Sequence, residues 1–234
     1  MGSAVVSSFV FRPVGPSAAG DIEQRGPQTV SDDRYKAALL FGSPGAGKGT
    51  QGEMLGRIPG FHHVSTGDVF RTLNPKSEIG RTFLEYSSRG DLVPDEITIR
   101  VWQENMHARE TLSMYDRDTQ LLVLDGIPRN PAQAKLMDEQ IDVLVVAHLT
   151  CADPEPMLER LRERAMKQNR PDDAKEEVVR RRWDVYVEDT RPVLDHYDGS
   201  LVRDIDALGT PAEVLAKVLG ELAPIQSRHF ESAL

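Results

Sequence analysis

The sequence predicts an α/β fold of three layers, in which a five-stranded parallel sheet lies between helices. Five short, mostly apolar runs alternate with stretches of helical periodicity after residue 35. The runs are of strand length and follow one another with helices between them, which is typical of buried parallel strands. A glycine-rich turn directly follows the first run, where a strand would pass into a helix.

Each element follows from this alternation and from local start and stop signals. The expected strands are residues 37–41, 62–65, 121–125, 143–149 and 200–205. The expected helices are residues 47–55, 67–73, 79–88, 95–109, 132–140, 156–167, 174–197 and 212–222. Several helices have a proline at or near their first turn, namely those after Pro94, Pro131, Pro154 and Pro211.

The chain divides into an extension, one domain and a tail. Residues 1–33 are rich in Gly, Pro and Ser without sustained periodicity, so we expect a flexible extension. Residues 34–223 are expected to form the domain, and residues 224–234 a C-terminal tail. Two segments exceed ordinary connections between strands and helices, so we expect insertions at about residues 65–95 and 164–173.

Bulk composition narrows the function classes. The formal net charge of −9 disfavours general binding to nucleic acid or to anionic membranes. No apolar run approaches the length of a membrane span. The single cysteine, Cys151, forms neither a disulfide framework nor a cysteine-rich zinc site by itself. A reduced, cytoplasmic setting is therefore expected, although the first 33 residues leave a targeting signal open.

The segment "GSPGAGKGTQ", residues 42–51, predicts a phosphate-binding loop. Successive backbone N–H groups in such a loop curl around an anion at a helix N-terminus, and Lys48 adds a positive charge for the outer phosphates. The common pattern has Ser or Thr after the lysine, but here Gly49 takes that place and the hydroxyl comes at Thr50. The alternative is a glycine-rich turn with a chance lysine.

A carboxylate ends the third expected strand. Asp125 in "LDGIPR" follows a buried run beside the loop, where it is well placed to orient Mg²⁺ or the waters around it. The alternative is a turn-capping aspartate ahead of Gly126.

Several arginines lie where they could meet phosphates. Taken singly, each is more typical of a solvated helix face. Arg71 and Arg129 follow the second and third strands, at the sheet edge where α/β proteins bind ligands. Arg160 and Arg164 lie four residues apart on one helix face. Together with Lys48, such charges would neutralise several phosphates and spread charge over a moving phosphoryl group.

These motifs, in order, resemble adenylate kinase within the nucleoside monophosphate kinases. The quoted motifs are "GSPGAGKGTQ", "HHVSTGDVFR", "RGDLVPDEITI", "LDGIPRNPAQA", "ERLRERAMKQNRPDD" and "RRRWDVY". The resemblance implies a P-loop NTPase-type fold with a helical insertion for the nucleoside monophosphate and a short lid without zinc. It implies reversible phosphoryl transfer from MgATP to AMP, giving two ADP, by a monomer. In this family glycine is normal at position 49.

The resemblance also implies site residues. ATP would contact Gly45, Ala46, Gly47, Lys48, Gly49, Thr50, Arg160, Arg164 and Gly209. AMP would contact Thr66, Arg71, Asp91, Leu92, Val93, Gly126, Ile127, Pro128, Arg129, Gln133, Arg170 and Arg182. The catalytic residues would be Lys48, Arg129, Arg164, Arg170 and Arg182, with Asp125 reaching Mg²⁺ through water. No general base is expected, because the attacking phosphate oxygen is already ionised, so His62 and His63 are expected to be strand residues.

Three departures and three alternatives accompany the resemblance. Ile127 stands where the family usually has an aromatic residue, and Ala165 and Asn169 replace glycines beside the lid. Thr66 and Gln133 favour AMP, whereas alanine and asparagine would favour UMP or CMP. Three alternative functions stay open. The protein could be a kinase for another nucleoside monophosphate, a nucleotide-binding module without turnover, or an adaptor tethered through residues 1–33.

Overall fold

The computed structural model describes residues 33–151, 153, 155–167 and 175–230, with the backbone alone for residues 163–167. The described residues belong to one of the two units of the chain, Asp33–Leu234. All of the predicted flexible extension except Asp33 lies outside the described residues, as do most of the predicted lid, with Asn169 and Arg170, and the last four residues. In the described part, no helix has the length and apolar character needed to cross a membrane.

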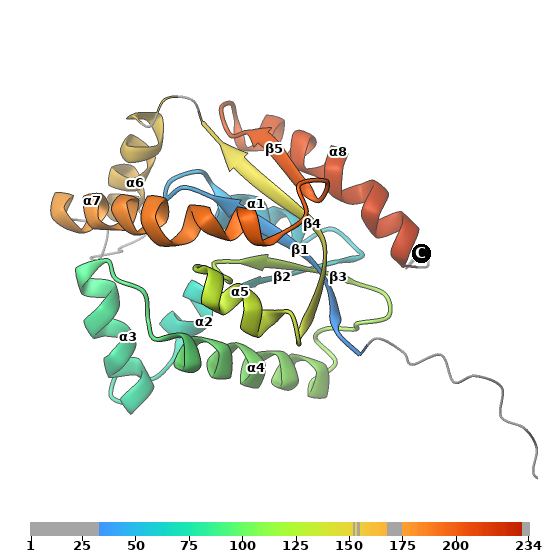
Figure 1. Ribbon diagram of the computed structural model, residues 1–234, viewed down its shortest axis with the longest axis horizontal. Helices are drawn as coiled ribbons and strands as arrows, with labels where there is room; N and C mark the ends of the chain where they lie inside the picture. The colour runs from blue at the N-terminus through green and yellow to red at the C-terminus, as the bar shows by residue number, and fades with distance from the viewer. Residues whose placement is uncertain (1–32, 152, 154, 168–174, 231–234) are drawn as a thin grey trace, which may run out of the picture. The chain divides into compact units, whose positions relative to one another are not determined.

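The five expected strands form one parallel sheet, which confirms the predicted fold class (Figure 1). The strands are β1 (Tyr35–Gly42), β2 (Phe61–Ser65), β3 (Leu121–Asp125), β4 (Ile141–Thr150) and β5 (Val202–Asp206). Their order across the sheet is β2-β3-β1-β4-β5. The first strand therefore lies in the centre, and the loop that follows it opens at the middle of the carboxyl edge, where parallel sheets bind ligands.

Helices cover both faces of the sheet, because the central strand is apolar on both sides. Ala37 and Leu39 of β1 pack into one core, and Ala38 and Leu40 pack into the other. The first core includes residues from α2 (Thr66–Thr72), α4 (Asp95–Thr111) and α5 (Pro131–Met137). The second core includes residues from α1 (Lys48–Leu55), α6 (Glu155–Lys167) and α8 (Pro211–His229). This arrangement is the predicted three-layer fold.

Local signals start several of these helices at the expected places. The Ser65 hydroxyl accepts from the Asp68 N–H at the start of α2, and Ser77 does the same for Gly80 at the start of α3 (Glu78–Arg89). Thr210 and Glu213 form a capping box at the start of α8. The termini of these elements are therefore fixed by side chains of the turn residues themselves.

The prediction of one continuous helix over residues 174–197 was wrong. Helix α7 (Glu176–Val185) passes into a π-helical turn η2 (Tyr186–Thr190) and a 3₁₀ segment η3 (Arg191–His196). Pro192 lies in the first turn of η3, where it has no N–H to continue the α-helical hydrogen bonding. The sequence has helical periodicity through this region, but it does not indicate that α-helical hydrogen bonding gives way to π-helical hydrogen bonding at Tyr186.

The last helix is longer than predicted. Helix α8 continues past Pro224 to His229, into the segment expected to be a tail. Phe230, which is 5% exposed, and the partly buried Ile225 pack against the second core. Burial of apolar side chains beyond the proline accounts for the extra turns.

Candidate active site

The glycine-rich loop between β1 and α1 has the conformation that a phosphate cradle needs. Gly45 and Gly47 have φ angles of +84° and +90°, which L side chains rarely adopt. A Cβ at Gly45 would lie 2.2 Å from the carbonyl oxygen of Met157 in α6, so only glycine lets the loop lie against that helix. Gly47 also has no side chain to cap α1, so the first N–H groups of the helix face the loop.

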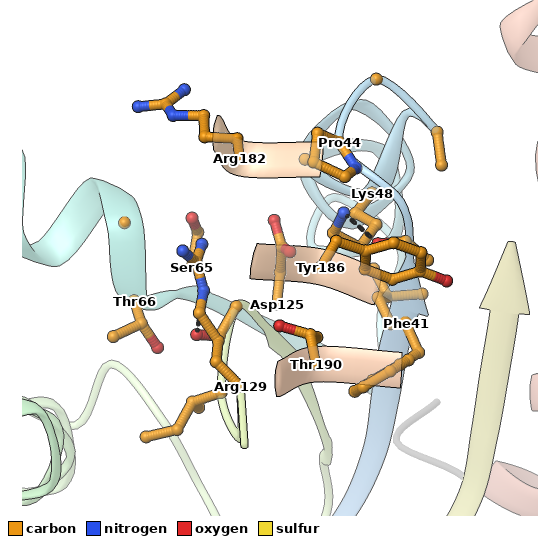
Figure 2. Close-up of a pocket in the computed structure, with 18 of the residues that line it drawn as sticks. Phe41, Pro44, Lys48, Ser65, Thr66, Asp125, Arg129, Arg182, Tyr186 and Thr190 are labelled. Atoms are coloured by element: carbon orange, nitrogen blue, oxygen red, sulfur yellow. Dashed lines mark hydrogen bonds between the residues drawn. The ribbon is translucent and has the colours of Figure 1, made fainter. Parts of the chain in front are cut away.

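The Lys48 side chain reaches back to the first residues of the loop. Its Nζ donates to the carbonyl oxygens of Gly42 and Ser43, at 2.8 and 3.0 Å. In Figure 2 Lys48 is drawn with Asp125, Arg129 and Arg182 among the residues that line one pocket. The loop therefore carries a fixed positive charge at the point where the outer phosphates of a nucleotide would lie.

One cavity of about 660 Å³ brings together nearly all the predicted site residues. Its lining includes Gly45, Ala46, Gly47, Lys48, Gly49, Thr50, Arg160 and Gly209 from the predicted donor side. It also includes Thr66, Arg71, Asp91, Leu92, Val93, Gly126, Ile127, Pro128, Arg129, Gln133 and Arg182 from the predicted acceptor side. Arg170 and the side chain of Arg164 lie outside the described residues. The cavity thus joins two halves that meet at Lys48 and Asp125.

In the acceptor half, Gln133 is held by its neighbours. The Gln133 side chain is almost fully buried. Its Oε1 accepts from the Arg129 N–H at 2.8 Å, and its Nε2 donates to Asp95 Oδ1 at 2.7 Å. Asn130 also donates to Asp95, and its own side-chain oxygen caps α5. These bonds fix the orientation of the amide and still leave one N–H and one lone pair on it.

Thr66 lies opposite as a buried polar group. Thr66 is 3% exposed, and its hydroxyl has no hydrogen-bond partner among the described residues. Leaving a buried hydroxyl unsatisfied costs about 1–3 kcal/mol, so such a group calls for an explanation. A polar ligand that enters the acceptor half when its walls close would supply the missing partner.

The arginines of the cavity are oriented by short polar contacts. Arg71 pairs with Asp68 at 2.6 Å, and the Arg129 Nε donates to the Gly126 carbonyl oxygen at 3.0 Å. Arg160 donates to the carbonyl oxygens of Ala207 and Gly209, at 3.1 and 3.5 Å. The guanidinium of Arg160 thereby joins α6 to the loop before α8, at the donor end of the cavity.

Asp125 lies at the centre of the site. It is the last residue of β3, is 8% exposed and is in register with Leu40 and Ser65. Its Oδ2 lies 3.7 Å from the position that a Cβ of residue 49 would take, which places the carboxylate beside the start of α1. Among the described residues, no group of three or more His, Cys, Asp or Glu side chains could hold a metal ion. A lone carboxylate that lines the same cavity as Thr50 fits a Mg²⁺ ion that arrives on phosphates and keeps most of its waters.

Sequence reasoning did not identify about half of the residues of the cavity wall, and two of those it missed, Tyr186 and Thr190, face the site from a helix. Tyr186 and Thr190 of η2 line the cavity with Arg182 of α7 (Figure 2). The three residues are spaced by four, so they lie on one helix face, and this spacing is the signal that could have found them. The motif that identified Arg182 stopped at Tyr186.

The two histidines of β2 are structural residues, as expected. His62 Nε2 is 3.1 Å from Arg109 Nη1, and burial together with that positive charge lowers the pKa of His62 to about 4. His63 lies against Gly52 of α1, and burial lowers its pKa. Neither side chain is part of the cavity wall. Both rings are therefore neutral near pH 7.

The fold and this cavity define a P-loop nucleotide-binding protein that has room for a second ligand beside the phosphates of the first. The family model for adenylate kinase matches residues 40–201. The adenylate kinase of Thermobifida fusca is 42% identical over 191 residues, which are 79% of this chain and 96% of that protein. The adenylate kinase of Kocuria rhizophila is 38% identical, over 79% of this chain and 97% of its own. That of Thermus thermophilus is 34% identical, over 81% of this chain and 98% of its own. The chain therefore belongs to the adenylate kinase family.

Proposed function

We propose that this chain catalyses reversible transfer of the terminal phosphoryl group of MgATP to AMP, giving two ADP. One observation carries the proposal: the loop with Lys48 and the half with Thr66 and Gln133 line a single cavity, and Arg129 and Arg182 line it as well. A protein that only bound ATP would not need an acceptor half or the arginines that serve both halves. The family membership supports the same reaction.

Catalysis on this proposal rests on position and charge. The attacking phosphate oxygen of AMP is already ionised, so no side chain has to remove a proton. The N–H groups of the loop and Lys48 hold the donor phosphates, while Arg129 and Arg182 neutralise the group in transfer. Mg²⁺ enters as part of the substrate MgATP, and Asp125 holds waters of its shell. We assign Arg164 and Arg170 to the same group of catalytic arginines from their motif in the sequence.

The acceptor is chosen by hydrogen bonds that the cavity leaves open. After its bonds to Arg129 and Asp95, the Gln133 amide retains one donor and one acceptor, a pair that matches the amino group and a ring nitrogen of adenine. The Thr66 hydroxyl adds a further group that lacks a partner. A base that leaves such groups unmatched is penalised. No observation favours the alternative of a UMP or CMP kinase, or of a module without turnover.

A phosphorus NMR time course of purified protein with MgATP and each of AMP, UMP, CMP and GMP tests the proposal. ADP should form from both nucleotides with AMP, and transfer to UMP, CMP or GMP, which would give ADP and the acceptor's own diphosphate, should be much slower. If a folded protein binds MgATP but phosphorylates none of them, the proposed reaction is wrong. Faster transfer to UMP or CMP than to AMP would refute the roles given to Thr66 and Gln133.

The proposal extends to the organisation of the protein. Residues at about 65–95 and 164–173 close over the substrates and exclude water, which would otherwise accept the phosphoryl group. The protein works as a cytoplasmic monomer on ATP, AMP and ADP without zinc, and the negative net charge keeps it from nucleic acid. Deleting residues 1–33 should leave the turnover number unchanged. Loss of turnover on this deletion would show that the extension belongs to the catalytic domain.

A further inference from the structure

A row of three side chains crosses the sheet just below the phosphate-binding loop. Phe41 of β1 is in register with His148 of β4, and His148 is in register with Asp204 of β5. The His148 side chain is 12% exposed, and its Nδ1 lies 2.7 Å from Asp204 Oδ1. Its ring meets the ring of Phe41 edge-on, with 6.2 Å between the centroids. Phe41 lines the cavity, so the row begins at the site and ends at the sheet edge.

Tyr186 covers this row from the helical side. Its hydroxyl lies 3.2 Å from His148 Nε2. Because the Asp204 carboxylate only accepts hydrogen bonds, Nδ1 carries the proton, and the Nε2 of a neutral ring is left to accept from the Tyr186 O–H. Burial raises the pKa of Tyr186, so the phenol remains a donor near pH 7. The histidine thus fixes one direction for the tyrosine hydroxyl.

The tyrosine lies at the middle of the helical face that meets the cavity. Arg182 is four residues before Tyr186 and Thr190 is four residues after it, and all three line the cavity. In Figure 2 the three residues follow one another on successive pieces of ribbon beside Asp125 and Lys48. Successive residues of a helix are about 100° apart, so a rotation by one position would turn Arg182 away from the site. Anchoring Tyr186 therefore anchors the direction in which Arg182 points.

We propose that His148, oriented by Asp204, is a positioning residue for phosphoryl transfer. Through Tyr186 it fixes the rotation of the α7 and η2 segment, and thereby holds Arg182 and Thr190 toward the transferring group. This inference rests on the proposed function. It assigns roles to His148, Asp204 and Tyr186 that the motifs in the sequence did not suggest. Tyr186 is also the first residue of the π-helical turn, a distortion that is often found at functional sites.

The test measures the rate of phosphoryl transfer by rapid quench, together with the KM values for MgATP and AMP. In Tyr186→Phe and His148→Leu the transfer rate should fall about ten- to hundredfold, because a small misplacement of a charged group is costly. The KM for MgATP should stay within about twofold, because the misplaced Arg182 serves AMP and the transferring group rather than the donor. His148→Gln keeps a hydrogen-bond acceptor near the position of Nε2 and should recover part of the rate.

A second histidine offers a matched control. His196 pairs with Asp138 at 2.9 Å and meets the ring of Tyr197 edge-on, but it does not line the cavity. His196→Leu should lower stability without slowing transfer. If it slows transfer as much as His148→Leu does, the effect is one of general stability and the proposal is wrong.

The double variant Tyr186→Phe/His148→Leu tests whether Tyr186 and His148 act through the same contact or independently. On the proposal it is no slower than the slower single variant, because both changes remove the same anchor. Losses that multiply, or an unchanged rate in Tyr186→Phe, would overturn the proposal. If His148→Leu does not fold, Tyr186→Phe and His148→Gln give the same decision. Wild-type protein in the same assay tests the proposed function separately, since ADP formation from AMP does not depend on the variants.

Discussion

Replacing Gly45 by alanine should weaken both the fold and the donor half of the cavity. At φ +84° an L side chain costs about 1–2 kcal/mol relative to glycine. The new Cβ would also lie 2.2 Å from the Met157 carbonyl oxygen, and displacing packed backbone costs a further ~1–3 kcal/mol. Gly45→Ala should therefore lower the free energy of unfolding by about 2–5 kcal/mol. Because the displaced segment of α6 also bears Arg160, MgATP should bind more weakly.

Gly47 provides the control for this prediction. Its φ is +90°, but nothing lies within 4 Å of the Cβ that Gly47→Ala would add. This variant should lose only the conformational part, about 1–2 kcal/mol. Urea unfolding followed by circular dichroism measures both free energies, and calorimetry measures MgATP affinity. Equal destabilisation of the two variants would refute the argument that the loop is held by its contact with Met157.

Three further predictions concern charge. Lys48→Ala should lower the turnover number about 10²–10³-fold, and near-normal turnover in a folded variant would remove Lys48 from the mechanism. Arg181 pairs with Asp91 at 2.9 Å, so Arg181→Gln should raise the KM for AMP by less than about threefold at low salt, and a difference that persists in about 0.5 M salt would contradict an exposed ion pair. The pKa of His62 falls from 6.5 to about 4 on folding, so the unfolded chain binds more protons and stability is lost as pH falls through that window. The unfolding free energy should therefore drop less in His62→Gln than in wild type between about pH 7 and pH 4, while His107→Gln, on the exposed face of α4, should behave as wild type.

The sheet could be predicted from the sequence because its signals are local. Each strand is a short apolar run followed by a turn or a capped helix, and the order of motifs identified the family. The positions of Lys48 and Asp125 at the carboxyl edge then follow from the parallel topology. The family resemblance named about half of the residues that line the cavity.

The features that the sequence did not predict depend on contacts between segments that are far apart in the chain. The turn at Tyr186 widens where the tyrosine meets His148, which is 38 residues earlier in the chain. Helix α8 passes Pro224 because Phe230 finds a buried place in the second core. The sequence predicted that Gln133 favours AMP, but not that half of its amide is held by Asp95 and the backbone of Arg129. Propensity and motif spacing do not contain these partners.

The central place of β1 has a consequence for how the protein is made. The ribosome produces Tyr35–Gly42 first, but the strands that flank it, Leu121–Asp125 and Ile141–Thr150, emerge much later. A nascent chain that ends before residue 141 has a phosphate loop whose strand lacks one of its two neighbours. During most of synthesis the phosphate-binding loop is therefore incomplete, and nucleotide in the cell cannot stabilise the chain by binding to it. Early apolar strands must stay protected until the second half of the sheet has been translated.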